Sequence, residues 1–229
     1  MPRPLHIGLI GGIGAAATVV YYQRLCAAVA KTGQTLDLTI VQADIRTLIR
    51  TNLADLRQEQ AEVYAPLLHR LKAAGAECAA ITSLGGHFCF EETVAISPLP
   101  LVSAVAPLDA FFAAQGIRRI GLLGTRVVMR TRLYGQLRRT EALALDDRIE
   151  ELGQLYQDVA VAGTCPPAGR ETFLEAGRQM MALGAEAIVL AGTDLNLAFD
   201  GQDPGYPVID ALDVHVARLA DLATGRATL

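Results

Sequence analysis

One stretch occurs twice in this chain of 229 residues, and it constrains the fold more than any other feature. Glu77–His87 reads ECAAITSLGGH, and Glu186–Asn196 reads EAIVLAGTDLN. Both copies follow a helical pattern that ends in Gly-Ala-Glu, and both lead from a short apolar run, such as Ala79–Thr82, into a small polar loop. In an α/β protein such a loop lies at the carboxyl end of a strand, where ligands bind. We therefore expect two equivalent strand ends that contribute to one site.

A second pair of matching segments supports an internal duplication. The segment from Ile7 reads IGLIGG, and the segment from Ile120 reads IGLLGT. A Tyr-x-Gln pattern recurs at the same separation, at Tyr21 and at Tyr134. Two independent sets of matches at similar separations are typical of a duplicated architecture.

Strand and helix patterns alternate along the chain, which predicts the α/β class with mostly parallel sheets. The expected strands are Leu5–Ile10, Leu36–Gln42, Ala79–Thr82, a short one around Leu101, Arg119–Leu123 and Ala187–Ala191. The expected helices are Ala15–Ala30, Gln58–Ala74, Val105–Gln115, Asp147–Val161, Pro167–Leu183 and Ala211–Ala223. We expect two pseudo-symmetric lobes, each a mostly parallel sheet flanked by helices, with the site in the cleft between them. The first lobe comprises residues 1–98 and 207–229, and the second comprises residues 99–206.

Composition narrows the class of partner. Hydrophobic residues make up 52% of the chain and charged residues only 19%, against about 25% charged in an average domain. This difference favours a homodimer or a higher homo-oligomer. The formal net charge is −4, and the chain has no basic run for a phosphate backbone, so we expect no nucleic acid partner.

The chain is predicted to be cytoplasmic. Its apolar runs are shorter than the roughly 20 residues of a membrane span, so no membrane association is expected. The glycines within Leu5–Ile13 favour a first strand over a signal peptide. The four cysteines, Cys26, Cys78, Cys89 and Cys165, lack metal-ligand spacing, which favours free thiols in a reducing compartment.

No cofactor is expected. The two lysines, Lys31 and Lys72, fall late in predicted helices, which argues against a Schiff base with pyridoxal phosphate and against a Walker P-loop. The glycine pattern after the first strand is not the dinucleotide fingerprint. The sequence has no pair of ligands at the usual zinc spacing, so we predict no stoichiometric metal.

Two segments of the first half are candidates for binding a small anion. The turn at Gly11 and Gly12 opens the first helix, whose amino end can hold an anion, although a tight turn without a ligand explains the same residues. Arg46 lies in a predicted loop, Asp44–Thr47. Its guanidinium can clamp a carboxylate, and a solvated surface arginine is the alternative interpretation. His69, on the expected helix Gln58–Ala74, is interpreted as structural.

The order of these motifs resembles the aspartate/glutamate racemase superfamily over nearly the whole chain. GLIGGIGAAATVVYY from Gly8 is similar to the family's G-x-x-G-G-M-G-P-x-A-T-x-x-Y-Y, and DIRT from Asp44 resembles its Arg-Thr loop. GLLGTRVVM from Gly121 and GTDL from Gly192 resemble G-L-L-G-T-x-x-T-M and G-C-T-E-[LI]. VIDALDVHVA from Val208 resembles the closing D-x-x-x-x-H-A.

The resemblance implies cofactor-free inversion at the α-carbon of an amino acid, commonly by two cysteines that act as acid and base. Carried over residue by residue, the first cysteine falls on Ser83 and the second on Gly192. The usual Asn and Thr of the first loop are replaced by Leu84 and Gly85, and a lysine of some aspartate-specific members aligns with Val161. The remaining positions that match the family's binding and catalytic residues are Gly11, Gly12, Arg46, His87, Thr125, Thr193 and Asp194.

Glycine has no proton to give, so these substitutions leave two functions open. In the first, the protein is a cofactor-independent isomerase or lyase acting on a small amino acid or carboxylic acid. Ser83, His87 and Asp194 would then supply acid and base groups, with His87 or Asp194 activating Ser83. Arg46, Thr125, Thr193 and the glycines at 11, 12, 85 and 192 would bind the substrate. In the second, the protein is an inactive relative that binds a small carboxylate or has a structural or regulatory role. Cys89 is interpreted as a buried thiol, with access to the cleft as the alternative.

Overall fold

The structure is a computed structural model that describes residues 2–229. The chain forms two compact units, residues 2–104 with 215–229 and residues 105–214. The sequence placed the boundaries near residues 98 and 206. The later second boundary has a physical reason, because Val208–Asp210 forms a strand that pairs within the sheet of the second unit. The expected short strand at Leu101 is a single parallel bridge to Ala79, within the first unit.

The first unit is built on a three-stranded sheet in the order β2-β1-β3. Its strands are β1 (Ile7–Gly11), β2 (Leu38–Gln42) and β3 (Cys78–Ile81). Its helices are α1 (Ala15–Ala30), α2 (Ile45–Leu53), α3 (Arg57–Ala73), the 3-10 helix η1 (Gly85–Cys89), α4 (Phe90–Ile96) and α10 (Ala211–Ala223), whose first turn precedes the unit boundary.

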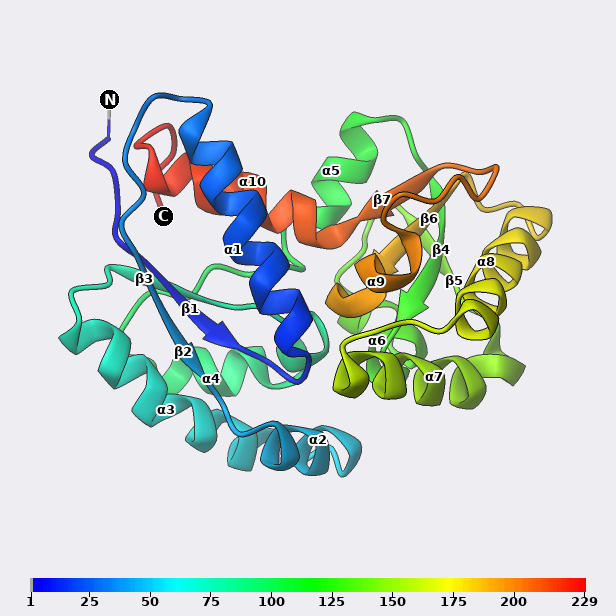
Figure 1. The fold of residues 1–229 in the computed structure, drawn as a ribbon, viewed down its shortest axis with the longest axis horizontal. Helices are drawn as coiled ribbons and strands as arrows, with labels where there is room; N and C mark the ends of the chain where they lie inside the picture. Colours follow the sequence, from blue (N-terminus) through cyan, green and yellow to red (C-terminus); the bar gives the residue numbers. More distant parts are fainter. Residues whose placement is uncertain (1) are drawn as a thin grey trace. The chain divides into compact units, whose positions relative to one another are not determined.

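Helices cover both faces of this sheet (Figure 1). A Cβ at Gly8 of β1 would meet Leu71 of α3, whereas one at Gly11 would meet Thr18 of α1. Successive strand residues point to opposite faces, so α3 and α1 pack on different sides. All residues of β1, the central strand, and of β3, which the bridge to Leu101 borders, are buried.

The second unit is built on a four-stranded sheet in the order β5-β4-β6-β7. Its strands are β4 (Arg119–Gly124), β5 (Glu141–Leu143), β6 (Ala187–Ala191) and β7 (Val208–Asp210). Its helices are α5 (Leu108–Ala114), α6 (Arg126–Arg130), α7 (Ile149–Ala162), α8 (Pro167–Ala182) and α9 (Asn196–Phe199), with 3-10 helices at Leu133–Gly135, Asp146–Arg148 and Thr193–Leu195.

The core of the second unit lies between its sheet and the helices α7 and α8. It contains Tyr156 of α7, Phe173 and Met180 of α8 and the inner strand residue Leu190, all of them buried. Pro167 occupies the first turn of α8, where its missing N–H costs no helical hydrogen bond.

The duplication is visible in the topology of the two sheets. The order β2-β1-β3 is repeated as β5-β4-β6, and Ile7 pairs with Cys78 as Ile120 pairs with Ala187. The glycines that precede the two matching strands, Gly75 and Gly184, both have φ of +95°, a conformation that favours glycine. Within residues 2–229 every strand pair is parallel. The predicted α/β class with two parallel-sheet lobes is confirmed.

Candidate functional site

The first matching loop is tied to the neighbouring strand at the end of β3. The backbone N–H and the hydroxyl of Thr82 both donate to the carbonyl oxygen of Ile10, each at 3.0 Å. The hydroxyl oxygen of Thr18, on α1, lies 2.8 Å from that of Thr82. Because the Thr82 proton is already donated, Thr18 is the donor in this pair. These bonds fix the position at which the chain leaves the sheet.

Ser83 follows directly and packs against the first glycine turn. Its side chain is 6% exposed, and its hydroxyl oxygen accepts a hydrogen bond from the Gly86 N–H at 3.3 Å. A Cβ at Gly12 would lie 2.8 Å from the Cβ of Ser83, a distance too short for two carbon atoms. Glycine at position 12 therefore allows the turn and the serine to come together.

His87 has a structural role that the sequence did not indicate. Its Nδ1 lies 2.8 Å from the carbonyl oxygen of Ser83, and its Nε2 lies 3.0 Å from the backbone nitrogen of Ala104. A carbonyl only accepts and an N–H only donates, so the ring is neutral with its proton on Nδ1. Burial lowers the pKa of His87 to about 4. The predicted activation of the Ser83 hydroxyl is not what the structure shows, because both ring nitrogens bond to backbone groups.

A second buried histidine supports the same segment. The hydroxyl of Tyr21 donates to His215 Nδ1 at 2.9 Å, and His215 Nε2 donates to the carbonyl oxygen of Val102 at 3.1 Å. Burial, with a smaller effect from His87, lowers the pKa of His215 to about 3. The two rings are 6.4 Å apart, centroid to centroid. Together they hold Val102 and Ala104 through backbone hydrogen bonds.

Cys89 lies inside the first unit. Its thiol is buried and lies 3.5 Å from the carbonyl oxygen of Gly86. Burial raises the pKa of Cys89 to about 11, so the thiol stays protonated at neutral pH. These surroundings support the interpretation of Cys89 as a buried thiol.

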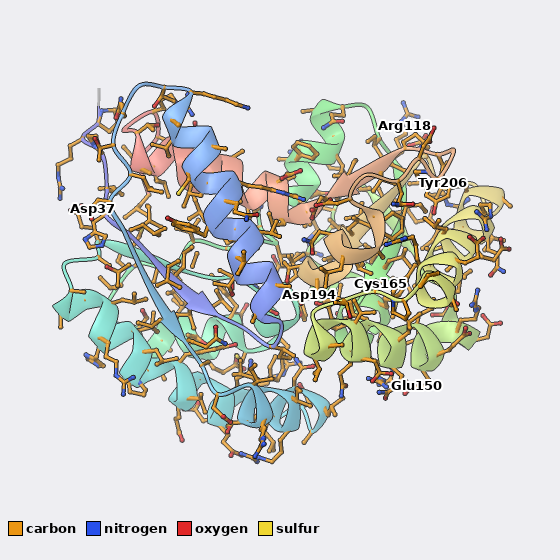
Figure 2. The ribbon with its side chains drawn as sticks, in the orientation of Figure 1. Asp37, Arg118, Glu150, Cys165, Asp194 and Tyr206 are labelled. Atoms are coloured by element: carbon orange, nitrogen blue, oxygen red, sulfur yellow. The ribbon has the colours of Figure 1, made fainter. Side chains whose placement is uncertain are left out.

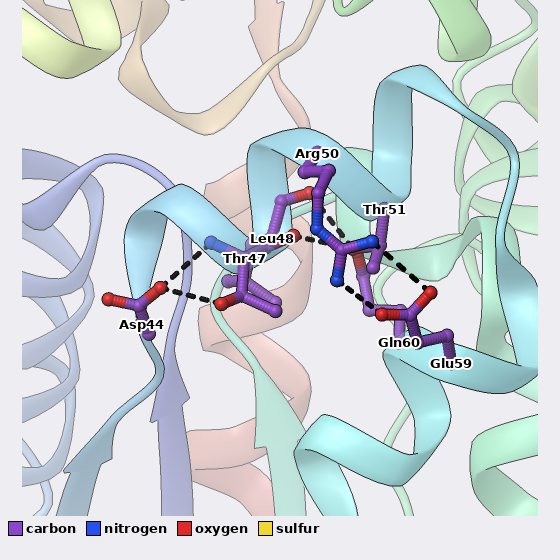
Figure 3. Close-up of polar contacts among 7 residues, drawn as sticks. All are labelled: Asp44, Thr47, Leu48, Arg50, Thr51, Glu59 and Gln60. Carbon is purple, nitrogen blue, oxygen red and sulfur yellow. Dashed lines mark hydrogen bonds and ion pairs between the residues drawn. The ribbon is translucent and has the colours of Figure 1, made fainter.

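Arg46 lies on a helix, and its predicted position in a loop is wrong. Asp44 caps α2 by accepting hydrogen bonds from the N–H of Thr47 at 2.8 Å and from its hydroxyl at 2.7 Å (Figure 3). Arg46 is an exposed residue in the first turn of this helix. One turn later, Arg50 forms an ion pair with Glu59 of α3. The chain turns into a helix here because Asp44 accepts from the Thr47 amide, one of the groups that the first turn leaves unpaired.

The side chain of Gln42 covers the first predicted binding glycine. Its amide donates to the carbonyl oxygens of Gly12 at 2.9 Å and of Ala43 at 3.1 Å. A Cβ at Gly11 would lie 2.7 Å from Cδ of Gln42. Gly85, another predicted binding residue, accepts a hydrogen bond from the side chain of Asn52 at 3.0 Å. Gln42 of β2 therefore braces the glycine turn, and Asn52 of α2 braces the loop that follows β3.

At the end of β6, Gly192 lies directly against a tyrosine that the sequence did not single out. A Cβ at Gly192 would lie 2.9 Å from both Cδ2 and Cζ of Tyr156 and closer still to Cε2. Real Cβ atoms essentially never approach other atoms so closely. The ring of Tyr156 therefore fills the space that a side chain at position 192 would occupy. In the sequence, Tyr156 is one of several buried apolar residues along α7, so periodicity alone indicates a core position.

Tyr156 also contacts the acidic residue that follows. Its hydroxyl donates to Oδ2 of Asp194 at 3.2 Å, and the two residues are 4% and 2% exposed. Burial and the charge of Asp194 raise the pKa of Tyr156 well above its usual value, while hydrogen bonds from the Asp194 N–H and the Thr193 side chain oppose this shift. Asp194 belongs to the 3-10 helix after β6 (Figure 2).

The second unit thus brings three polar groups together at one strand end, those of Tyr156, Thr193 and Asp194. Thr125 at the end of β4 is buried, and its hydroxyl caps α6 by accepting from the Val128 N–H at 3.4 Å. The prediction that the strand ends of β3 and β6 form one site stays a prediction. Among residues 2–229 no three His, Cys, Asp or Glu side chains are grouped so that they could hold a metal ion. None of the helices in that range is both long and apolar enough to cross a membrane.

Comparisons with known proteins agree with this architecture. The sequence profile of the Asp/Glu/hydantoin racemase family matches residues 10–219. The structure of a candidate Asp/Glu racemase from Yersinia pestis is similar with a TM-score of 0.77 and 25% identity, covering 95% of this chain and 98% of that one. An aspartate racemase homologue from Pyrococcus horikoshii OT3 matches with a TM-score of 0.75 and 22% identity, over 97% of this chain and 99% of that one.

A glutamate racemase from Francisella tularensis, solved in complex with D-glutamate, shares the fold at lower similarity. The TM-score is 0.65 and the identity 12%, with 96% of this chain and 80% of that chain covered. The family profile spans most of the sequence, and the duplicated parallel sheets are those of the racemase structures. The chain belongs to the Asp/Glu/hydantoin racemase family.

Proposed function

We propose that this protein catalyses cofactor-independent proton transfer on a small amino acid or carboxylic acid, as an isomerase or a lyase. The observation that carries the proposal is the buried carboxylate of Asp194 beside the hydroxyl of Tyr156 at the end of β6. A buried carboxylate is costly unless it is hydrogen-bonded, and such groups are concentrated at functional sites. Membership of a racemase family supports the same class of chemistry.

The usual two-thiol reaction of the family does not fit these residues. By the motif resemblance, the two cysteines correspond to Ser83 and Gly192. A serine hydroxyl is a weak base without an activating partner, and the ring of His87 bonds to the Ser83 carbonyl instead of its hydroxyl. Position 192 has neither a proton donor nor space for one. We therefore expect the acid and base groups to differ from those of a two-thiol racemase.

The proposed roles follow the local structure. Ser83 and Asp194 remain the proposed acid and base groups, and His87 is reassigned to positioning the loop that carries Ser83. The glycine turn at Gly11 and Gly12 lies at the amino end of α1, where backbone N–H groups favour an anion.

Four further residues keep the binding roles that the sequence predicts. Arg46 is an exposed cation on α2, while Gly85, Thr125 and Thr193 lie at strand ends within their own units. The glutamate racemases of Francisella tularensis and Thermus thermophilus were solved with D-glutamate and β-chloro-D-alanine. Both ligands are small amino acids, which supports a small carboxylate as the ligand here.

The proposal is tested by deuterium incorporation in D₂O. The protein is incubated with both enantiomers of aspartate and glutamate and with 2-methylmalonate, and the products are followed by ¹H NMR. Transfer of a solvent proton to carbon places deuterium beside the carboxylate, whether the carbanion arises by deprotonation or by loss of CO₂. We expect deuterium in the product of at least one of these acids. No deuterium in any of them would contradict the proposal.

An inactive relative that binds a small carboxylate is the second candidate. The observation that favours it is position 192, which has no acid or base side chain and whose space the ring of Tyr156 fills. Calorimetric binding of a dicarboxylate without deuterium incorporation would support this candidate over the first.

A further inference from the structure

The hydroxyl of Tyr156, the tyrosine that packs against Gly192, donates a hydrogen bond to the carboxylate of Asp194. Tyr206, also in the second unit, provides a comparison. It too packs against a glycine, since a Cβ at Gly177 would lie 3.0 Å from Cε2 of Tyr206, but its hydroxyl donates to the backbone carbonyl of Leu174 at 3.0 Å. Both tyrosines fill space beside a glycine, so filling space does not explain why Tyr156 faces Asp194.

The groups around the hydroxyl oxygen of Tyr156 suit a proton donor, whose oxygen becomes negatively charged when the proton leaves. It donates to Asp194 Oδ2, and hydrogen bonding by the Asp194 backbone and the Thr193 side chain lowers the pKa of Tyr156 against the larger effects of burial and the Asp194 charge. The two donors stabilise negative charge on the oxygen, in the way that fixed donors stabilise an oxyanion. Burial and the Asp194 carboxylate keep the proton on the phenol until it is needed.

We propose that Tyr156 is the catalytic proton donor at the end of β6, where its hydroxyl replaces the side chain that Gly192 lacks. This inference rests on the proposed function, and it assigns one step of that reaction to one atom. Tyr156 would touch the reacting carbon of the substrate as the acid in place of Asp194, and Thr193 and Asp194 would position its hydroxyl.

The step balances without a further reactant. The Tyr156 O–H bond breaks and its electron pair stays on oxygen. The proton forms a C–H bond with the electron pair of the substrate carbanion. The phenolate left behind is held by the Asp194 N–H and the Thr193 side chain, and it takes a proton from water after the product leaves. Because the phenol is a weak acid, it suits protonation of a strongly basic carbanion better than removal of a proton from the substrate.

The experiment compares the full-length protein with the variants Tyr156→Phe and Tyr206→Phe. Tyr156→Phe keeps the ring against Gly192 and removes only the hydroxyl, and Tyr206→Phe makes the same change beside Gly177. Each protein is incubated in D₂O with the enantiomers of aspartate and glutamate and with 2-methylmalonate. Rates are measured by ¹H NMR, affinities for the same acids by calorimetry and folding by circular dichroism.

We expect Tyr156→Phe to incorporate deuterium at least 100-fold more slowly, the lower range of acid–base effects, with affinity within threefold of the unmodified protein. Tyr206→Phe should keep its rate within twofold. The rate of the unmodified protein should not fall between pH 8 and pH 10, because the donor keeps its proton over that range.

Two results overturn the assignment of Tyr156 while leaving the proposed function intact. One is a Tyr156→Phe rate within threefold of the unmodified rate, and the other is an alkaline fall in the unmodified rate below pH 10. A folded, unmodified protein that incorporates no deuterium overturns the proposed function itself, and this inference with it.

Discussion

The ring of Tyr156 lies where a side chain at position 192 would project, with Cζ only 2.9 Å from a Cβ at that glycine. The residue pair explains why glycine is required at the end of β6 in this chain. It also changes what a substitution at 192 can achieve, because any larger residue must first displace an aromatic ring from a packed core.

The first prediction concerns the fit between positions 192 and 156. Gly192→Ala should lower the free energy of unfolding by about 1–3 kcal/mol, the usual cost of overpacking a core. Urea denaturation measures the loss. The control is a double-mutant cycle with Tyr156→Ala, in which removal of the ring opens the space. The loss from Gly192→Ala should largely disappear in the Tyr156→Ala background, and equal losses in both backgrounds would contradict the packing argument.

The second prediction is that stability falls with acid through the range in which histidines titrate. The pKa of His87 is about 4 in the folded state and about 6.5 when unfolded. The unfolded chain binds more protons between these values, so stability is complete above about pH 6.5 and declines as the pH falls toward 4. His87 alone should contribute a loss of about 3 kcal/mol, and His215 acts in the same direction.

Urea denaturation at several pH values between 7.5 and 4 checks this dependence. Two histidine variants distinguish a loss of stability caused by the buried rings from one caused by histidines on the surface. His87→Gln should be less stable at pH 7.5 and should show a shallower loss toward acid, whereas His69→Gln, at an exposed position of α3, should follow the unmodified protein. If both variants keep the full slope, the acid loss does not come from the buried pair.

Much of the fold could be predicted from the sequence, because its central elements carry strong periodic patterns. The boundaries of α1, β6 and α10 agree with the expected ranges Ala15–Ala30, Ala187–Ala191 and Ala211–Ala223. The shortest strands could not be predicted. The strands β5 and β7 have three residues each, too few to show alternation. The helix α2 did have a signal, since Asp44 directly precedes its first apolar residue, Ile45, as N-cap residues do.

The candidate site was harder to predict, because its hydrogen bonds join residues that are distant in sequence. Ser83 and Asp194 could be identified from the loops that follow two matching strands. Tyr156 could not, because a tyrosine on the buried face of α7 is typical of a core position. The sequence also favoured a chemical role for His87, whereas its bonds to the backbone depend on the placement of Ala104, 17 residues later.

The third prediction separates a binding arginine from a structural one on the same helix. Arg46→Ala should weaken calorimetric binding of a small dicarboxylate by roughly 10- to 100-fold, or about 1.5–3 kcal/mol for a lost charged hydrogen bond. Arg50→Ala is the matched control, since Arg50 lies one turn later on α2 and pairs with Glu59. It should leave the affinity unchanged. Equal effects of the two substitutions would show that Arg46 has no specific role in binding the dicarboxylate.

The fourth prediction concerns aspartate and glutamate themselves. A two-thiol racemase exchanges the α-proton of either enantiomer because one thiol removes the proton and the other returns it. With a hydroxyl at Ser83 and no side chain at Gly192, this protein should produce little of the D-enantiomer from L-aspartate or L-glutamate, as measured by chiral chromatography. Gly192→Cys should not restore the reaction, because the new side chain collides with Tyr156 and because Ser83 still supplies a hydroxyl.

The triple change Ser83→Cys, Gly192→Cys and Tyr156→Ala supplies both thiols and opens the space for the second one. Any gain in racemisation should therefore occur in this triple variant and not in the variant with cysteine at 192 alone. Rapid racemisation by the unmodified protein would show that Ser83 and Gly192 are not the equivalents of the two cysteines, or that another pair of groups carries the two protons.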